Sequence, residues 1–146
     1  MPSQVRDQIE LLIRARYPIL YVVSWEETRV RDLVAEVAKR RNKRLYEWSA
    51  TTGITPAGTP IQSQKGRNPA TRDPLVALDQ VIDQVEPALF LFHDFHPFLQ
   101  KNNYAVIRRL KEISIHLKNS YKTILIEYTI LEVPPELEKE ITVLDF

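Results

Sequence analysis

The stretch ILYVVSWEE, residues 19–27, decides the fold class, because a continuous apolar run passes directly into a polar break. The run Ile19–Val23 is typical of a β-strand that is buried on both faces. Ser24 can cap a following helix, and the carboxylates of Glu26 and Glu27 suit the positive N-terminal end of that helix. We therefore predict a buried strand that leads into a helix.

The same pattern of apolar strands and amphipathic helices continues along the chain. Five strands are predicted near residues 18–24, 44–49, 87–93, 122–128 and 141–145. Doubly buried strands that alternate with helices are typical of a parallel sheet with helices on both faces. We therefore expect residues 1–146 to form a single domain, an α/β fold of three layers around a five-stranded parallel sheet.

The composition narrows the function classes. The chain of 146 residues is 44% hydrophobic and 27% charged, and its formal net charge is +1. These values are typical of a globular domain, and no global charge favours binding to nucleic acid or to an anionic membrane. The sequence contains no cysteine, which excludes disulfides and thiolate metal sites.

Polar segments follow the predicted strands and include the places where a ligand could bind. In open parallel sheets, ligands bind beyond the carboxyl ends of the strands. Those ends correspond to residues 24–26, 49–52, 93–96 and 127–129. Residues 50–73 also contain all three glycines and three prolines of the chain, so we expect a long loop there, and such loops are often functional.

The segment after the first strand lacks the features of a phosphate-binding loop. Such a loop needs glycines, whose backbone amides converge on the phosphates, and a lysine that reaches them. Residues 24–29 read SWEETR and contain neither. Two carboxylates would repel a triphosphate there, and Trp25 is expected to fill the space. We therefore expect that this chain does not bind ATP in the manner of P-loop proteins.

The cluster HDFH, residues 93–96, leaves two hypotheses open. In the first, His93, Asp94 and His96 bind a metal ion in a small metal-dependent phosphohydrolase. Residues 93 and 94 are adjacent on a strand, so their side chains point to opposite faces, which counts against a shared ion. In the second, Asp94 is structural and accepts hydrogen bonds from nearby amides or hydroxyls, with Ser24 and Thr129 as donors.

A basic cluster suggests a third function, a nucleic-acid-binding module. It consists of Lys39, Arg40, Arg41, Lys43 and Arg44, and two aromatic residues follow it. Such a patch could contact phosphates. A structural interpretation is stronger, because cations near the C-terminus of a helix stabilise its dipole.

Several segments resemble one family of AAA ATPases, which is encoded in some chloroplast genomes and in cyanobacteria (hypothetical chloroplast reading frame forty-six). The resemblance covers nearly the whole chain, and its last segment, PELEKEITVLDF, is quite specific. The segments are residues 17–30, 45–49, 73–78, 93–99 and 135–146.

In that family this region precedes a linker and a complete ATPase module. The resemblance therefore implies a degenerate AAA-like fold without a Walker A motif and with the strand order 5-1-4-3-2. Residues 90–95 resemble a Walker B strand with Phe95 in place of the catalytic glutamate. Residues 124–129 resemble the sensor strand without its asparagine. ATP and Mg are then expected in the absent C-terminal module, beyond residue 146, and this chain is expected to hold no cofactor and no metal.

The function implied by the resemblance is a non-catalytic N-terminal domain of an AAA ATPase that remodels proteins. We expect it to bind neighbouring subunits of an ATPase ring, or a protein partner or substrate, and not a membrane or nucleic acid. The expected location is the cyanobacterial cytosol or the chloroplast stroma. The candidate partner surface combines the loop 51–72 with six strand-end residues, Ser24, Trp25, Glu26, Glu27, Asp94 and His96.

Overall fold

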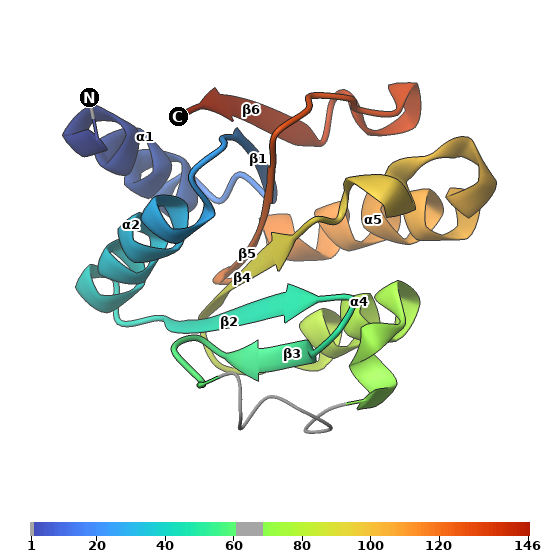
Figure 1. Ribbon diagram of the computed structural model, residues 1–146, viewed down its shortest axis with the longest axis horizontal. Coiled ribbons are helices and arrows are strands. Elements are labelled where there is room, and N and C mark those ends of the chain that lie inside the picture. The colour runs from blue at the N-terminus through green and yellow to red at the C-terminus, as the bar shows by residue number, and fades with distance from the viewer. Residues whose placement is uncertain (1, 61–68) are drawn as a thin grey trace.

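A six-stranded sheet between two layers of helices forms the body of the domain (Figure 1). The computed structural model describes residues 2–60 and 69–146. The helices and strands along the chain are α1 (Pro2–Arg14), β1 (Ile19–Val23), α2 (Glu27–Arg40), β2 (Arg44–Ser49), β3 (Gly53–Pro56), α4 (Pro74–Asp83), β4 (Ala88–His93), α5 (Tyr104–Lys118), β5 (Lys122–Tyr128) and β6 (Ile141–Asp145). Short 3₁₀ turns are η1 (Pro69–Arg72), η2 (His96–Leu99), η3 (Lys101–Asn103) and η4 (Pro135–Leu137).

The strands lie in the order β3-β2-β4-β5-β1-β6. The five predicted strands are mutually parallel and keep their predicted relative order. The predicted strand count of five is wrong, and so is the expectation of an entirely parallel sheet, because β3 adds a sixth, antiparallel strand beside β2. The fold class is otherwise the α/β class that the sequence pattern indicates.

The extra strand β3 lies inside the segment that was expected to be loop. It is four residues long and contains glycine and proline, which are uncommon inside strands. A turn through Thr52 and Gly53, whose φ is +71°, returns the chain alongside β2. Thr71 from η1 then holds it: its hydroxyl accepts from the Ile54 amide at 2.8 Å, while its carbonyl accepts from the Trp48 indole at 2.6 Å.

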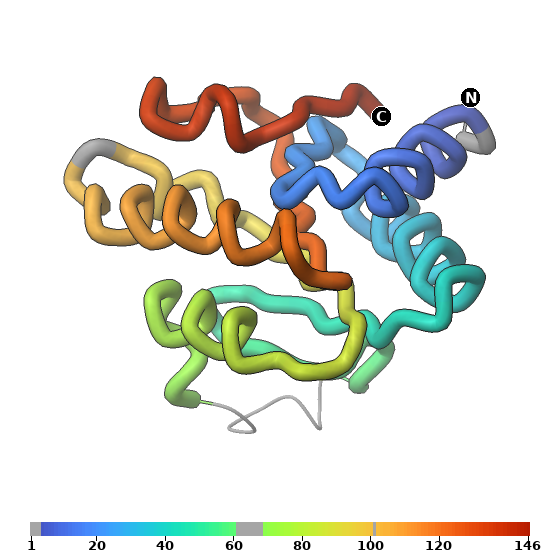
Figure 2. Tube along the Cα trace, turned by 180° about the vertical axis from the view of Figure 1, so that it is seen from behind, coloured from blue at the N-terminus to red at the C-terminus, as the bar shows by residue number. Residues whose placement is uncertain are grey.

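The two faces of the sheet are covered by different helix pairs. Residues of α1 and α2 pack with Leu20, Val22, Leu89, Leu91 and Leu125 on one face. Residues of α4 and α5 pack on the other face, over Tyr21, Phe90, Phe92, Ile124 and Ile126. Figure 2 shows α4 and α5 side by side over their face, with α1 and α2 grouped at the other side.

The helix boundaries follow local capping signals. Asp73 caps α4, since its carboxylate accepts from the Leu75 amide at 2.8 Å, and Pro74 occupies the first turn as predicted. In the described part of the chain, residues 2–60 and 69–146, no helix has the length and apolar character needed to cross a membrane.

Candidate functional site

A pocket of about 420 Å³ opens beyond the carboxyl ends of β2 and β4, next to the N-terminus of α2. Charged or ionisable side chains line it: Glu27 and Arg31 from α2, Glu47 from β2 and His93 from β4. Hydroxyl groups of Ser49, Thr51, Thr52 and Thr55 and the guanidinium of Arg72 also line it. This is the end of the sheet where ligands of α/β proteins bind.

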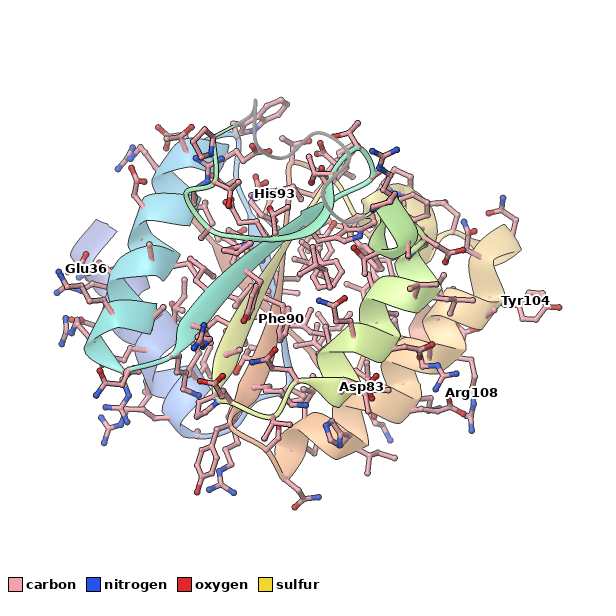
Figure 3. The ribbon with its side chains drawn as sticks, turned by 90° about the horizontal axis from the view of Figure 1, so that it is seen from below. Glu36, Asp83, Phe90, His93, Tyr104 and Arg108 are labelled. Atoms are coloured by element: carbon pink, nitrogen blue, oxygen red, sulfur yellow. The ribbon has the colours of Figure 1, made fainter. Side chains whose placement is uncertain are left out.

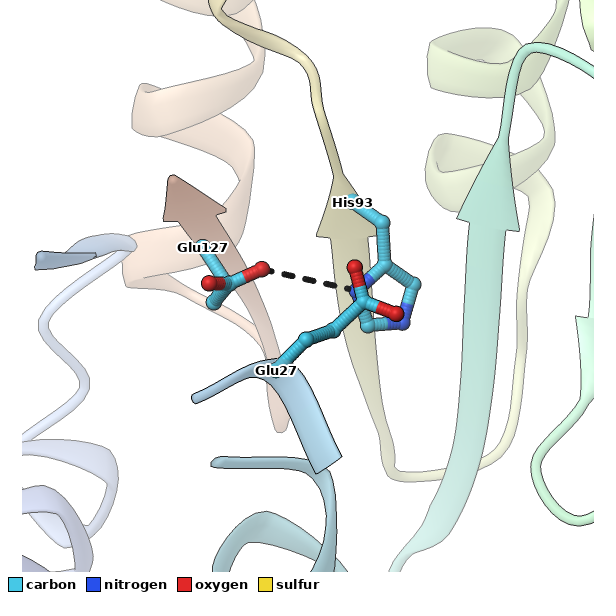
Figure 4. Close-up of side chains that lie close together, drawn as sticks. All are labelled: Glu27, His93 and Glu127. Carbon is cyan, nitrogen blue, oxygen red and sulfur yellow. Dashed lines mark ion pairs between the residues drawn. The ribbon is translucent and has the colours of Figure 1, made fainter. Parts of the chain in front are cut away.

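His93 lies at the centre of the charged cluster and contacts carboxylates on both sides. Its Nε2 lies 2.8 Å from Oε1 of Glu47. Its Nδ1 lies 3.6 Å from Oε1 of Glu27 and 3.8 Å from Oε1 of Glu127, which are ion-pair distances too long for hydrogen bonds. Figure 4 shows the side chains of Glu27, His93 and Glu127 converging from α2, β4 and β5.

The electrostatics of the cluster favour a charged imidazole. Burial by itself would lower the pKa of His93, but the carboxylates of Glu127, Glu47 and Glu27 outweigh it and raise the pKa to about 9. Burial would likewise raise the pKa of Glu47, but hydrogen bonds from His93 and Arg31 lower it below its ordinary value. At neutral pH the cluster therefore contains an imidazolium and a carboxylate held together away from water.

Arg31 completes the contacts of Glu47. Its Nε donates to Oε1 of Glu47 at 2.6 Å, and Glu47 is only 7% exposed. Glu47 thus accepts from two charged donors, which satisfies a carboxylate that would otherwise be costly to bury.

Strand alternation explains why these side chains meet. Successive residues of a strand point to opposite faces of the sheet. His93 follows Leu89 and Leu91 on the face that α2 covers, and Glu127 follows Leu125 on the same face. His93 and Glu127 are also direct partners in the parallel register of β4 and β5. Figure 3 shows His93 at one end of the sheet, with α2 on one side and α4 and α5 on the other.

The residues that follow β1 shape the mouth of this region. The N-cap of α2 is Glu26, so the prediction that Ser24 caps this helix is wrong. The Ser24 hydroxyl instead accepts from the Glu26 amide at 2.9 Å, in the turn before the helix. The Glu26 carboxylate pairs with Arg29 at 2.8 Å. Trp25 is 85% exposed, so the expectation that it fills the space beyond β1 is wrong. Glu27, the first residue of α2, is the carboxylate that faces His93.

Asp94 differs from its sequence-based interpretation. It is exposed, with a left-handed φ of +53°, and it lines the rim of the pocket. The expected hydrogen bonds from Ser24 and Thr129 are not found among the described residues. The prediction of a buried structural carboxylate is therefore wrong, because the left-handed turn after β4 directs this residue to solvent.

His96 does not join His93. It is buried in η2, and its ring stacks on Tyr128 with a centroid distance of 5.0 Å. Tyr128 packs against the core on the α4 and α5 face, opposite to the face of His93. The hypothesis of a metal site formed by His93, Asp94 and His96 is therefore wrong, although His93 itself lies in a cluster that could bind an ion.

The basic cluster at the end of α2 makes contacts within the domain. Arg40 and Arg41 lie 3.3 and 4.0 Å from the carboxylate of Glu10. Arg44 pairs with Glu86 at 3.0 Å, and Lys43 donates to the carbonyl of Tyr121 at 2.9 Å. These contacts support the structural interpretation of the cluster.

The candidate loop 51–72 is described only in part. Its first residues form the turn into β3 and the strand itself, and its last form η1. Residues 61–68 lie outside the described residues. Glu47, which sequence reasoning did not single out, is central to the site, together with Glu127 from the predicted strand end 127–129. The available signal for Glu47 was a carboxylate between the aromatic residues Tyr46 and Trp48 of a predicted strand.

Three comparisons place the chain among known proteins. The sequence profile of a family described as SpoVK-like AAA ATPase, N-terminal domain, matches residues 5–146. The AAA domain-containing protein ycf46 of Trieres chinensis is 36% identical over 143 residues, and the match covers 96% of this chain and 27% of that protein. The ycf46 protein of Guillardia theta is 35% identical, with 99% and 27% covered. The chain thus spans about a quarter of the length of these relatives.

Solved structures share the fold at low sequence identity. PCH-2 of C. elegans superposes with a TM-score of 0.57 at 11% identity, covering 99% of this chain and 42% of that chain. A chain of the Drosophila ORC bound to AT-rich DNA and Cdc6 superposes with a TM-score of 0.54 at 10% identity, covering 99% and 54%.

Proposed function

Because the chain belongs to the family of SpoVK-like AAA ATPase N-terminal domains, we propose that it is a non-catalytic assembly or partner-binding domain. In this proposal it binds a neighbouring subunit or a protein substrate and couples it to an AAA ATPase ring in the cyanobacterial cytosol or the chloroplast stroma. ATP and Mg would bind in an ATPase module beyond residue 146.

The observation that carries the proposal is the arrangement at the N-terminus of α2. In a P-loop protein the first amides of this helix and a preceding glycine loop hold the phosphates. Here Glu27 opens the helix, and its carboxylate faces His93, with the buried Glu127 beyond. Since three carboxylates, including Glu47, surround His93, a triphosphate would be repelled there.

Exposed apolar side chains in the segments that follow β1 and β5 suit a protein partner. Trp25, Ile130 and Leu131 are 85%, 50% and 48% exposed. They lie in the segments that follow β1 and β5, which are neighbouring strands. The Tyr21 hydroxyl donates to the carbonyl of Ile130 and so fixes the second segment. Exposed tryptophan is enriched among residues that dominate binding energy at protein interfaces.

Calorimetry of the isolated chain with ATP and MgCl₂ tests the absence of a nucleotide site. We expect no heat of binding beyond dilution. A dissociation constant in the low micromolar range, which corresponds to a binding free energy of about −8 kcal/mol, would overturn the proposal.

The partner role is tested in the full-length protein, where this domain is joined to its ATPase module. Trp25→Ala is expected to lower ring assembly or substrate-stimulated ATP hydrolysis without changing the stability of this domain. Val85→Ala is a matched control, because Val85 is 94% exposed and lies before the start of β4, away from the carboxyl ends of the strands. Equal behaviour of the two variants would contradict a docking role for Trp25.

The two alternative functions have less support. The phosphohydrolase hypothesis used His93, Asp94 and His96, but Asp94 is exposed at the pocket rim and His96 stacks on Tyr128, on the opposite face to His93. The nucleic-acid hypothesis used residues 39–44, of which four are paired within the domain.

A further inference from the structure

We propose that Glu27, His93 and Glu127 form a binding site for a divalent transition metal of the zinc class. The first indication is Nδ1 of His93, which is buried and has no hydrogen-bond partner. The His93 residue is 7% exposed, and this nitrogen points toward the two carboxylates (Figure 4). A buried polar atom without a partner calls for a ligand that would satisfy it.

The spacing of the three ligand atoms fits one ion. Tetrahedral zinc with bonds of about 2.0–2.1 Å separates its ligand atoms by about 3.3 Å. Nδ1 of His93 lies 3.6 Å from Glu27 and 3.8 Å from Glu127, and all three ligand atoms lie within 4.8 Å of one another. The two distances from Nδ1 need a contraction of a few tenths of an ångström, and the two carboxylates need to approach each other by up to about 1.5 Å. The Glu27 side chain, 47% exposed, is free to make that adjustment.

The groups around His93 already orient it as a metal ligand. Metal-binding histidines usually donate their other ring nitrogen to a carboxylate, which fixes the tautomer and raises the basicity of the ligand. Nε2 of His93 lies 2.8 Å from Glu47, and Arg31 holds Glu47 in place at 2.6 Å. When Nε2 carries the hydrogen and donates to Glu47, the lone pair of a neutral ring lies on Nδ1 and faces Glu27 and Glu127.

The charge of the cluster matches a dication. With a neutral imidazole, the carboxylates of Glu27, Glu47 and Glu127 and the guanidinium of Arg31 sum to two negative charges. A divalent ion neutralises them. A proton on Nδ1 compensates only one of the two negative charges. Because a metal ion needs the lone pair of Nδ1, the metal and the proton compete for that nitrogen.

The ligand types select the metal. Mg²⁺ and Ca²⁺ prefer sites made of oxygen atoms, whereas an imidazole with two carboxylates suits Zn²⁺ and its first-row neighbours. Glu27 and His93 also line the pocket of about 420 Å³, so water or a group from a bound partner can supply a fourth ligand. The site is thus distinct in chemistry from a magnesium–nucleotide site.

The test uses the chain after chelator treatment and dialysis, with Zn²⁺ titrated by calorimetry and Co²⁺ as a spectroscopic probe. We expect one Zn²⁺ per chain and the visible absorption of four-coordinate Co²⁺ with a nitrogen ligand. Absence of binding, or several weak sites without a Co²⁺ spectrum, overturns the proposal.

Paired variants localise the ion. Glu27→Gln is expected to weaken Zn²⁺ binding about 100-fold or more, since even the loss of an outer partner costs about 10- to 100-fold. Glu27 is half-exposed, so this variant tests the site without threatening the fold. Glu26→Gln is the matched control, because the neighbouring carboxylate pairs with Arg29 and should leave affinity unchanged. Equal loss in both variants, or none in Glu27→Gln, refutes the assignment.

The outcome is independent of the proposed assembly role. Hydrolysis of p-nitrophenyl phosphate by the zinc-loaded chain would contradict the non-catalytic function while leaving the metal site intact. Failure to bind zinc would leave the assembly role untouched.

Discussion

His93 and Glu127 are direct partners in the parallel register of β4 and β5, and both side chains leave the sheet on the face covered by α2. Nδ1 of His93 lies 3.8 Å from Oε1 of Glu127 as a result. Neither residue is near the other in sequence, so only the pairing of the two strands creates this contact. This contact with the Glu127 carboxylate helps to raise the pKa of His93.

Stability in the presence of chelator should fall as pH rises from about 6.5 to about 9. The folded-state pKa of His93 is raised to about 9, whereas an unfolded histidine titrates near 6.5. The stabilisation is complete below pH 6.5 and is lost as pH passes through the folded pKa. We expect a loss of roughly 2–4 kcal/mol from this group. Urea unfolding at pH 6, 7.5 and 9 measures it.

His93→Gln is the reference for that measurement. The difference in unfolding free energy between the native chain and this variant should shrink as pH rises. A difference that stays constant over the range would mean that His93 does not titrate with the raised pKa.

Glu47→Gln should destabilise the domain by roughly 2–4 kcal/mol, because it leaves the His93 imidazolium without its closest carboxylate and removes the charge that Arg31 pairs with. Denaturant unfolding at pH 7 gives the value. Glu86→Gln is the control, since Glu86 and Arg44 form a pair in which both side chains are about 60% exposed. The control should show no measurable change. Equal free energies of unfolding for Glu47→Gln and Glu86→Gln would show that Glu47 does not stabilise the domain through these contacts.

Lys122→Met should lower the free energy of unfolding by roughly 1–3 kcal/mol. The ammonium of Lys122 donates to the carbonyls of Val81 at 2.7 Å and Ile82 at 2.9 Å, in the last turn of α4. The last carbonyls of a helix lack amide donors from a following turn, although the Val81 carbonyl also accepts from the Gln84 amide at 3.3 Å. Loss of the lysine therefore leaves the Ile82 carbonyl unsatisfied. Thermal unfolding compares this variant with Lys118→Met, a change on the exposed side of α5. A smaller loss in Lys122→Met than in the control would show that the capping role is wrong.

Asp94→Asn should change stability by no more than about 0.5 kcal/mol, because Asp94 is exposed and its φ of +53° suits asparagine as well. Asp94→Val should cost about 1–2 kcal/mol, since a β-branched residue is strained in the left-handed region. Chemical unfolding of the two variants side by side checks both values. A large loss in Asp94→Asn would restore the structural role first predicted for this carboxylate.

Sequence patterns predicted the elements better than their contacts. The apolar run of residues 19–23 and the similar runs later in the chain predicted the five parallel strands. A strand that is buried on both faces is apolar at most of its positions, which makes it visible in the sequence. The strand β3 was missed because Gly53 and Pro56 are typical of loops, and its pairing with β2 depends on Thr71, fifteen residues beyond Pro56.

The sequence alone determined that the segment after β1 has no glycine cradle, since no folding can supply a residue type that the chain lacks. Tertiary structure decided which polar residues act together. His93 was expected beside Asp94 and His96, yet its partners are Glu27, Glu47 and Glu127 from three other elements. The physical reason is that strand alternation separates neighbours in sequence, whereas register and helix packing bring distant carboxylates to the same face of the sheet.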